Sequence, residues 1–293
     1  MKSQKSKSNF IIQASLGKVL TCIGVILSQF AFAQNPYKDD KGKWGIKDDN
    51  GKITIAAKFD KEFSFDGRKI IPVSLNGKTG FINTEGKTIV PFQYENAGNF
   101  NEGLAPIQLN KKWGFIDLNN KLVIKPQFNN AQSFNEGFAP YAEGGKWNGG
   151  DYPYFEGGKW GYIDKTGKII IKAQFDLVGD FSEGLAAVGT NNNQSLFYGY
   201  INKTGKVVIK HFYNHADRFS NGIALVVIGD GASNNQHIFI KKDNTHVFSP
   251  IMCSRINGDG QTFKEKGKVK VYAFDDNFNE ISYFINIKGE KVK

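Results

Sequence analysis

Cysteine is almost absent from this chain of 293 residues, which contains only Cys22 and Cys253. Cys22 lies in an N-terminal apolar run, so a chain that loses this run keeps one cysteine and can form no internal disulfide. Proline is scarce, with 8 residues, whereas glycine is frequent, with 33. This composition is typical of short strands joined by tight turns. The fold is therefore expected to be stabilised by packing.

Long hydrophobic runs are also absent, apart from one near the N-terminus. Residues 19–32 are uncharged and largely apolar, follow four lysines and no acid, and end at Ala31-Phe32-Ala33. This pattern predicts a signal peptide over residues 1–33 with cleavage after Ala33. The lipoprotein alternative would use Cys22, but this cysteine lies inside the apolar run. The chain is expected to be exported to the periplasm, the outer surface or the medium, without a transmembrane segment after cleavage.

Clustered charge is missing as well. The net charge of +10, less the four leader lysines, leaves +6, and these charges are spread over the expected turns. A nucleic-acid partner is not expected, because it would need a concentrated basic face. The sequence also contains no phosphate-binding glycine loop, nucleophile elbow or zinc-protease helix. We therefore predict no catalytic residue, no metal and no cofactor.

A nine-residue motif occurs five times without gaps, and its second residue is always glycine. An aromatic residue follows this glycine after 14 residues, and a phenylalanine follows it after 20. The motif glycines are Gly45, Gly80, Gly114, Gly161 and Gly199. Their spacings are 35, 34, 47 and 38 residues, which gives a natural period of about 34.

Each unit reads as strand, turn, strand, irregular link and third strand. We predict an all-β fold of about six three-stranded units within residues 34–293, stacked as a solenoid-like or superhelical array. A closed β-propeller is the alternative, although its blades usually have four strands and about 40 residues. The units are predicted to start near residues 43, 78, 112, 159 and 197, with a degenerate unit near 236 and a half-unit near 282.

Three motif copies contain Trp-Gly, at Trp44-Gly45, Trp113-Gly114 and Trp160-Gly161. In this the chain resembles the WG-repeat family of bacterial proteins. Thr79 and Tyr198 precede the other two glycines, which indicates that the tryptophan is a packing residue. The resemblance implies an all-β repeat domain of exported or envelope proteins, and it carries over no catalytic residue.

The third unit is 13 residues longer than the period, and it contains the pentapeptide Glu-Gly-Gly-Lys-Trp twice, ending at Trp147 and Trp160. The period assigns Trp160 to the repeat and Trp147 to inserted material. Trp147, Tyr152, Tyr154 and Phe155 are the candidate binding residues, because aromatic rings on a long loop suit a protein or a glycan. The alternative is that these rings fold back as a lid over the third and fourth units.

Glu102, Glu136 and Glu183 recur at one position of the repeat. As a row they could bind calcium or a cationic polymer, or serve a carbohydrate-active or peptidase-like enzyme. The alternative is that each accepts backbone hydrogen bonds beside its glycine turn, since the fifth unit has Asn221 there. We favour this alternative, and we expect a non-enzymatic binding or scaffold module for protein or glycan at the bacterial cell envelope.

Overall fold

The computed structural model describes residues 35–148, 154–192, 195–229, 235–249, 251–253, 255–257, 260–274 and 279–293. Backbone contacts separate Met1–Ala33 from Gln34–Lys293, and every described residue belongs to the second part. The predicted signal peptide over residues 1–33 lies outside the described residues. Within the described ranges, no helix has the length and apolar character needed to cross a membrane.

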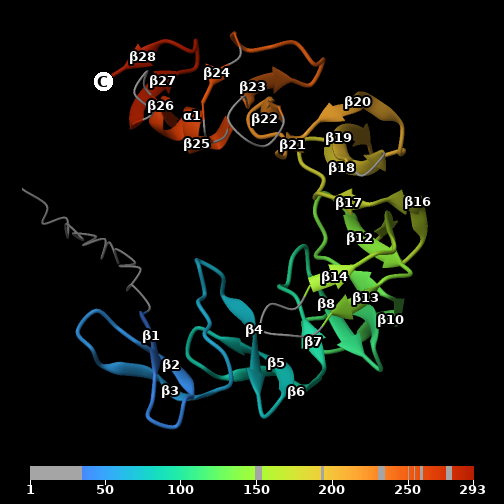
Figure 1. Cartoon of the computed structure of the whole chain (residues 1–293). Helices are drawn as coiled ribbons and strands as arrows, with labels where there is room; N and C mark the ends of the chain where they lie inside the picture. The colour runs from blue at the N-terminus through green and yellow to red at the C-terminus, as the bar shows by residue number, and fades with distance from the viewer. Residues whose placement is uncertain are drawn as a thin grey trace, which may run out of the picture. The chain divides into compact units, whose positions relative to one another are not determined.

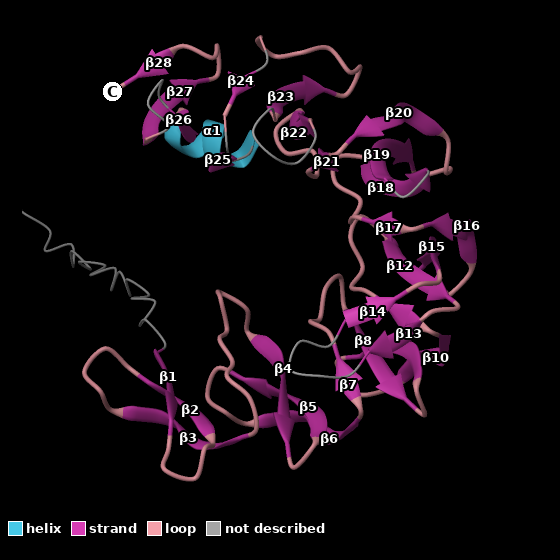
Figure 2. Ribbon diagram, viewed as in Figure 1, coloured by secondary structure: helices cyan, strands magenta, loops and turns pink. Residues whose placement is uncertain are grey.

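Small antiparallel sheets follow one another along the chain (Figure 1, Figure 2). Two sheets have three strands: β1 (Asn35–Lys38), β2 (Trp44–Lys47) and β3 (Ile53–Phe59); then β4 (Ile70–Leu75), β5 (Lys78–Asn83) and β6 (Thr88–Tyr94). The next three have four strands each: β7 (Asn96–Ala97), β8 (Leu104–Leu109), β9 (Lys112–Asp117) and β10 (Leu122–Phe128); β11 (Asn130–Ala131), β12 (Phe138–Glu143), β15 (Lys159–Asp164) and β16 (Ile169–Phe175); β17 (Leu177–Val178), β18 (Leu185–Asn192), β19 (Ser195–Asn202) and β20 (Val207–Tyr213).

The C-terminal sheets keep the same antiparallel arrangement but are less regular. They consist of β21 (His215–Ala216), β22 (Ile223–Ile228), β23 (Gln236–Lys241) and β24 (Ile251–Met252), followed by β25 (Arg255–Asn257), β26 (Lys268–Phe274), β27 (Glu280–Asn286) and β28 (Lys291–Val292). A hairpin of β13 (Lys146–Asn148) and β14 (Tyr154–Glu156) and the helix α1 (Gly260–Lys266) complete the described elements. The predicted all-β tandem repeat is confirmed, with one short helix in the degenerate C-terminal region.

The predicted three strands of a unit are present, but they are divided between two sheets. Strand β8 ends the second unit, yet it pairs with β9 of the third from Leu104↔Asp117 to Leu109↔Lys112. Only Asn110 and Lys111 connect these strands, both with positive φ, and so short a turn makes them antiparallel neighbours. The longer link folds into a further two-residue strand, such as β7, on the same sheet. Successive units therefore interlock through shared sheets.

The motif glycine allows the first and second strands of a unit to approach each other. A Cβ on Gly161 would lie 2.3 Å from the carbonyl oxygen of Ile171 and 2.7 Å from the backbone nitrogen of Ala173. The strand register shifts at this point, as in a β-bulge. The same backbone obstruction, at 2.4 to 2.7 Å from a carbonyl oxygen, occurs at Gly45, Gly80, Gly114 and Gly199. The motif glycine thus has a structural role in every unit.

Aromatic rings build the core in a repeated arrangement. The residue after the motif glycine packs on the phenylalanine of the link with centroid separations of 4.7 to 4.9 Å, in the pairs Phe81–Phe100, Phe115–Phe134, Tyr162–Phe181 and Tyr200–Phe219. Trp113 and Trp160 are also buried, while Trp44 is half-buried. The second to fifth units therefore supply the same ring contact, whereas the first unit has Ile46 after its motif glycine. The motif tryptophans contribute by packing.

The aromatic residue of one unit is matched to a residue in the hairpin turn of the next unit. Where this turn has asparagine, a tyrosine of the preceding unit donates a 2.6 Å hydrogen bond to it, from Tyr94 to Asn120 and from Tyr213 to Asn244. Where the turn has glycine, the tyrosine is replaced by phenylalanine, which has no hydroxyl to satisfy. This holds for the pairs Phe59 and Gly86, Phe128 and Gly167, and Phe175 and Gly205. The choice of ring in one unit therefore follows the turn residue of the next.

Candidate functional site

The junction hairpins, which join the third strand of one unit to the first strand of the next, are the variable part of the repeat. Two have two-residue turns, at Asn76-Gly77 and Asn110-Lys111. The junction between β12 and β15 instead contains an additional hairpin, residues 144–158. Because β12 and β15 remain paired up to Glu143↔Lys159, the extra residues lengthen this junction without altering the strand pairing beside it.

In four of the junction hairpins an acidic or amide side chain accepts a hydrogen bond from a backbone N–H at the end of the hairpin. The donor–acceptor distances are 2.8 to 2.9 Å for Gly77 to Asp60, Lys111 to Glu95, Asn191 to Asp176 and Gly229 to Asn214. Lys43 pairs with Asp60 and Lys159 with Asp176, both at 2.7 Å. These residues were not predicted from the sequence, although each directly follows the aromatic residue of its unit.

The inserted hairpin explains the duplicated pentapeptide. Glu143 of the first copy pairs with Lys159 of the second, and Lys146 of the first pairs with Glu156 of the second. Between these pairs both chains pass through a Gly-Gly step in which all four glycines have φ of 68 to 75°. Two equal Gly-Gly breaks opposite each other let the ribbon change direction and then resume pairing. The duplication thus builds two matching halves of one kinked hairpin.

The predicted aromatic binding residues are distributed as follows. Trp147 and Tyr154 lie on opposite strands of the inserted hairpin, in the pairs Trp147↔Phe155 and Asn148↔Tyr154. Phe155 is half-buried, and its ring packs edge-to-face on Trp160 with 5.7 Å between centroids. Tyr152, with the rest of the hairpin tip, lies outside the described residues. Phe155 therefore folds back on the repeat, as in the lid alternative.

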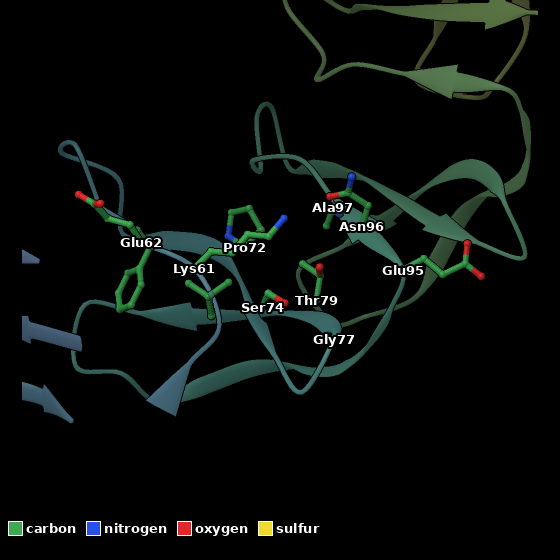
Figure 3. A pocket seen from close by; sticks show the side chains of 11 residues that line it. Lys61, Glu62, Pro72, Ser74, Gly77, Thr79, Glu95, Asn96 and Ala97 are labelled. Carbon is green, nitrogen blue, oxygen red and sulfur yellow. Dashed lines mark hydrogen bonds between the residues drawn. The ribbon is translucent and has the colours of Figure 1, made fainter. Parts of the chain in front are cut away.

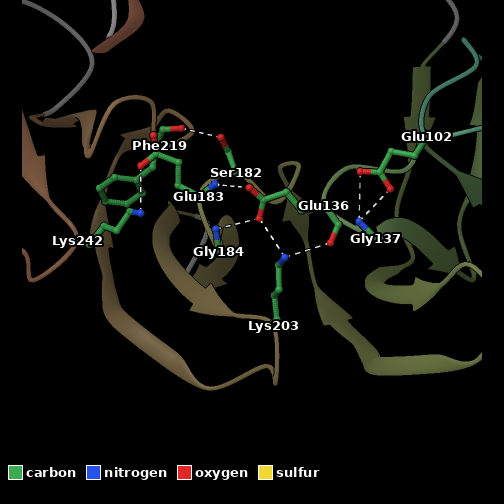
Figure 4. A network of polar contacts seen from close by, with 9 residues as sticks. All are labelled: Glu102, Glu136, Gly137, Ser182, Glu183, Gly184, Lys203, Phe219 and Lys242. Carbon is green, nitrogen blue, oxygen red and sulfur yellow. Dashed lines mark hydrogen bonds and ion pairs between the residues drawn. The ribbon is translucent and has the colours of Figure 1, made fainter.

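The three predicted glutamates link successive units (Figure 4). Each has a left-handed backbone, with φ of 49 to 52°. Glu136 accepts hydrogen bonds from the N–H groups of Glu183 and Gly184, at 2.6 and 2.9 Å. Glu102 accepts from Gly137 and Glu183 accepts from Gly222, each at 3.0 Å. The carboxylates accept backbone hydrogen bonds, as favoured from the sequence, but from the turn of the following unit and not from their own.

A lysine two units further along the chain completes each link. The ion pairs Lys165–Glu102, Lys203–Glu136 and Lys242–Glu183 have distances of 3.0 to 3.2 Å. Lys165 and Lys203 also donate to the backbone carbonyl oxygens of Glu102 and Glu136, each at 3.1 Å. We call these three glutamates and three lysines the Glu–Lys ladder. Its lysines were not identified from the sequence.

Units that lack the ladder glutamate also lack the lysine two units further along the chain. The first unit has Asp66 near the glutamate position, and the turn two units later has Leu118 in place of lysine. The fifth unit has Asn221, and the corresponding later turn has Ile287. Both apolar residues are exposed, at 46% and 45%. A lysine therefore occurs where there is a glutamate to pair with, which fits a structural role for the ladder.

The pKa values of two ladder glutamates, Glu102 and Glu136, are shifted in the same direction. Burial by itself would raise the pKa of Glu102 and Glu136, but the N–H donors and the paired lysines outweigh it and lower both values. Acid–base catalysis by two carboxyls uses environments that move their two pKa values apart. Among the described residues, no group of three or more His, Cys, Asp or Glu side chains is placed to hold a metal ion. The ladder has the properties of a structural clamp.

Stability should depend on pH in the acidic range. The pKa values of Asp60, Asp176, Glu102 and Glu136 are lowered in the folded chain, so the unfolded chain binds protons at higher pH. The contribution of these four carboxyl groups to the free energy of unfolding should therefore be constant above about pH 5 and fall as the pH decreases from about 5 to 3. Urea titrations at each pH measure it. A Glu102→Gln, Glu136→Gln variant should show a smaller fall, and equal stability at pH 5 and 3 would contradict the prediction.

The repeats identify the family. A family model described as WG containing repeat matches residues 44–78, 80–113, 113–147, 160–193 and 198–231. These segments make up more than half of the chain, and residues 148–159, which contain most of the insertion, lie between the third and fourth. No curated protein matches the chain.

Solved structures with some likeness include the tricorn protease, the AfRom2 CNH domain and the apo form of the AtxE2 isopeptidase. The tricorn protease is 14% identical, with a TM-score of 0.37, over 86% of this chain and 29% of its own. The AfRom2 domain is 9% identical, with a TM-score of 0.26, over 77% and 93%. The isopeptidase is 8% identical, with a TM-score of 0.27, over 88% and 48%. This chain thus spans well under two thirds of the two enzymes, and such low TM-scores carry no conclusion about it. The five matched segments and the interlocked sheets that they form place the chain in the WG containing repeat family.

Proposed function

We propose that this chain is a non-enzymatic binding or scaffold module that recognises a protein or a glycan at the bacterial cell envelope. In this proposal residues 1–33 are a signal peptide, and the mature chain acts in the periplasm, on the outer surface or in the medium. The inserted hairpin at the β12–β15 junction is the recognition element. The observation that carries the proposal is that this hairpin extends one junction without changing the register of the repeat around it.

The other prominent side chains of the repeat are occupied by internal contacts. The motif glycines permit close strand approach, the ladder residues clamp successive units, and Asp60 and its equivalents hold the junction hairpins. The hairpin adds material that none of these functions requires. Loops inserted into a regular scaffold are common places for binding residues, and tyrosine and tryptophan suit both peptide and sugar partners.

The alternative of a carbohydrate-active or peptidase-like enzyme has less support. It would use the carboxylates of the ladder, yet each of these accepts backbone N–H groups and pairs with a lysine. A carboxyl that must accept or donate a proton needs access to the reacting group and a pKa suited to that step. Repeated, closely similar environments supply no distinct acid and base.

A hairpin replacement tests the proposed function. Residues 144–158 are exchanged for the Asn-Lys turn that joins β8 to β9, because Glu143↔Lys159 has the same place in its sheet as Leu109↔Lys112. We expect binding to glycan or peptide arrays to fall at least about tenfold, with circular dichroism and melting temperature nearly unchanged. A surface-matched control carries Lys168→Gln on a different, exposed turn. Equal binding by the intact and replaced chains would remove the hairpin from the proposal.

A further inference from the structure

The second unit lacks the ring that most other units place at one strand position. Trp44, Trp113, Trp160 and Tyr198 directly precede the motif glycine of their units, but the second unit has Thr79. Trp113 and Trp160 are 5% and 6% exposed, so their indoles fill space within the repeat. Threonine is much smaller than tryptophan. The second unit therefore supplies no aromatic ring of its own at this strand position.

A hollow is present at this place (Figure 3). It has a volume of about 350 Å³ and is bordered by Thr79, by Pro72 and Val73 of β4, and by Phe63 of the preceding link. Such a volume lies at the small end of ligand pockets, and it suits one ring system better than a larger molecule. The hollow therefore borders the strand position at which other units carry a ring.

The hollow is lined by both apolar and charged side chains. Phe63 and Val73 are buried, whereas Lys61, Glu62 and Glu95 are exposed and carry charges of both signs. Apolar side chains thus form one part of the wall, and polar and charged groups form the rest. The apolar part can take the face of a ring, and the polar groups leave its substituents in water. In the third unit the Trp113 indole has no hydrogen-bond partner at its nitrogen. Packing alone thus holds a ring at the equivalent place.

We propose that this hollow is a binding site for a single aromatic ring of about indole size, presented either by a free aromatic molecule or by an aromatic side chain of a peptide. The ligand should have the shape of an indole, because the first, third and fourth units carry that ring at the same strand position. Cavities formed by removing a buried ring or alkyl group bind small aromatic molecules of matching size. The site is separate from the inserted hairpin, so it does not rest on the proposed function.

The test uses indole and N-acetyl-tryptophan amide as probes of the purified chain, with binding followed by methyl NMR shifts of Val73. We expect saturable binding at one site. Thr79→Trp should weaken it at least about tenfold. Filling the hollow should also raise the melting temperature by about 2–4 °C. Thr79→Tyr, which copies the fifth unit, is a second filling variant if the tryptophan disturbs the sheet.

The matched control is Thr88→Trp, which adds the same ring at an exposed position on β6 of the same sheet. It should leave probe binding unchanged. Absence of binding to the unmodified chain, or equal binding by a folded Thr79→Trp or Thr79→Tyr variant, would overturn the proposal. A tryptophan-containing peptide separates the two sources of the ring. Tighter binding of the peptide than of indole assigns the site to peptide side chains, and equal or weaker binding assigns it to free aromatic molecules.

Discussion

Gly161→Ala is expected to lower the free energy of unfolding by about 3 kcal/mol, although it adds a single methyl group. The new Cβ would lie 2.3 Å from the carbonyl oxygen of Ile171 and 2.7 Å from the backbone nitrogen of Ala173. Both obstructing atoms belong to the backbone of β16, so no side-chain rotation can relieve the clash. The strands would have to separate at the bulge, which disturbs the hydrogen bonds and the buried Trp160 beside it. Urea unfolding followed by circular dichroism measures the loss.

Gly179→Ala is the matched control for this substitution. Its Cβ would meet the carbonyl oxygen of Ala187 at 3.5 Å, an ordinary van der Waals distance, and its φ is not positive. We expect a change of less than about 1 kcal/mol. Similar losses at the two positions would show that the close strand approach at Gly161 is not what makes this glycine necessary.

The repeat itself could be predicted from the sequence because each unit uses the same residues at the same spacing. Gly161 and its equivalents recur with an aromatic residue and a phenylalanine at fixed distances, and local strand and turn preferences act within a few residues. The division of each unit between two sheets was not predicted. It depends on which neighbour a third strand pairs with, and the two-residue turn at Asn110-Lys111 decides this.

Contacts between units were accessible from the sequence but were not recognised. The exchange of Tyr94 and Tyr213 for phenylalanine elsewhere follows the asparagine or glycine of the next turn. A comparison of units one by one does not show this, because the matched residues belong to different units. The ladder lysines are harder still. Lys203 follows its partner Glu136 by 67 residues, a separation that no local pattern suggests.

The candidate binding residues were located by the period alone, and the structure adds orientation for one of them. Phe155 packs on Trp160 because the two Gly-Gly steps turn the hairpin back toward its own repeat. Sequence periodicity places the insertion but does not say which way its strands turn. Thr79 was likewise visible as a departure from the motif, but no hollow was predicted from it. Its meaning depends on the burial of Trp113 and Trp160, which only a structure reveals.

Glu136→Asn should lower the free energy of unfolding by about 2 kcal/mol. Asparagine occurs naturally at this position in the fifth unit, as Asn221 with φ of 52°, so the left-handed backbone is retained. Its side chain is too short to reach the next turn. The N–H groups of Glu183 and Gly184 then lose their acceptor, and the third and fourth units lose a direct link. Hydrogen exchange at these two amides should accelerate in parallel with the loss of stability.

Two further variants separate the hydrogen bonds from the ion pair. Lys203→Met removes the charge partner but leaves both backbone donors on Glu136, and it should cost only about 0.5 kcal/mol because the pair is exposed. Glu183→Asn removes the acceptor of the Gly222 N–H group and should cost at least about 1 kcal/mol. Both glutamate variants are therefore expected to cost more than Lys203→Met. If Lys203→Met cost as much as Glu136→Asn, the ladder would act through charge, and its stabilisation would fall with added salt.

Because each unit is coupled to its nearest neighbours, breaking the link at Glu136 should also make unfolding less cooperative, with a smaller dependence of the unfolding free energy on urea.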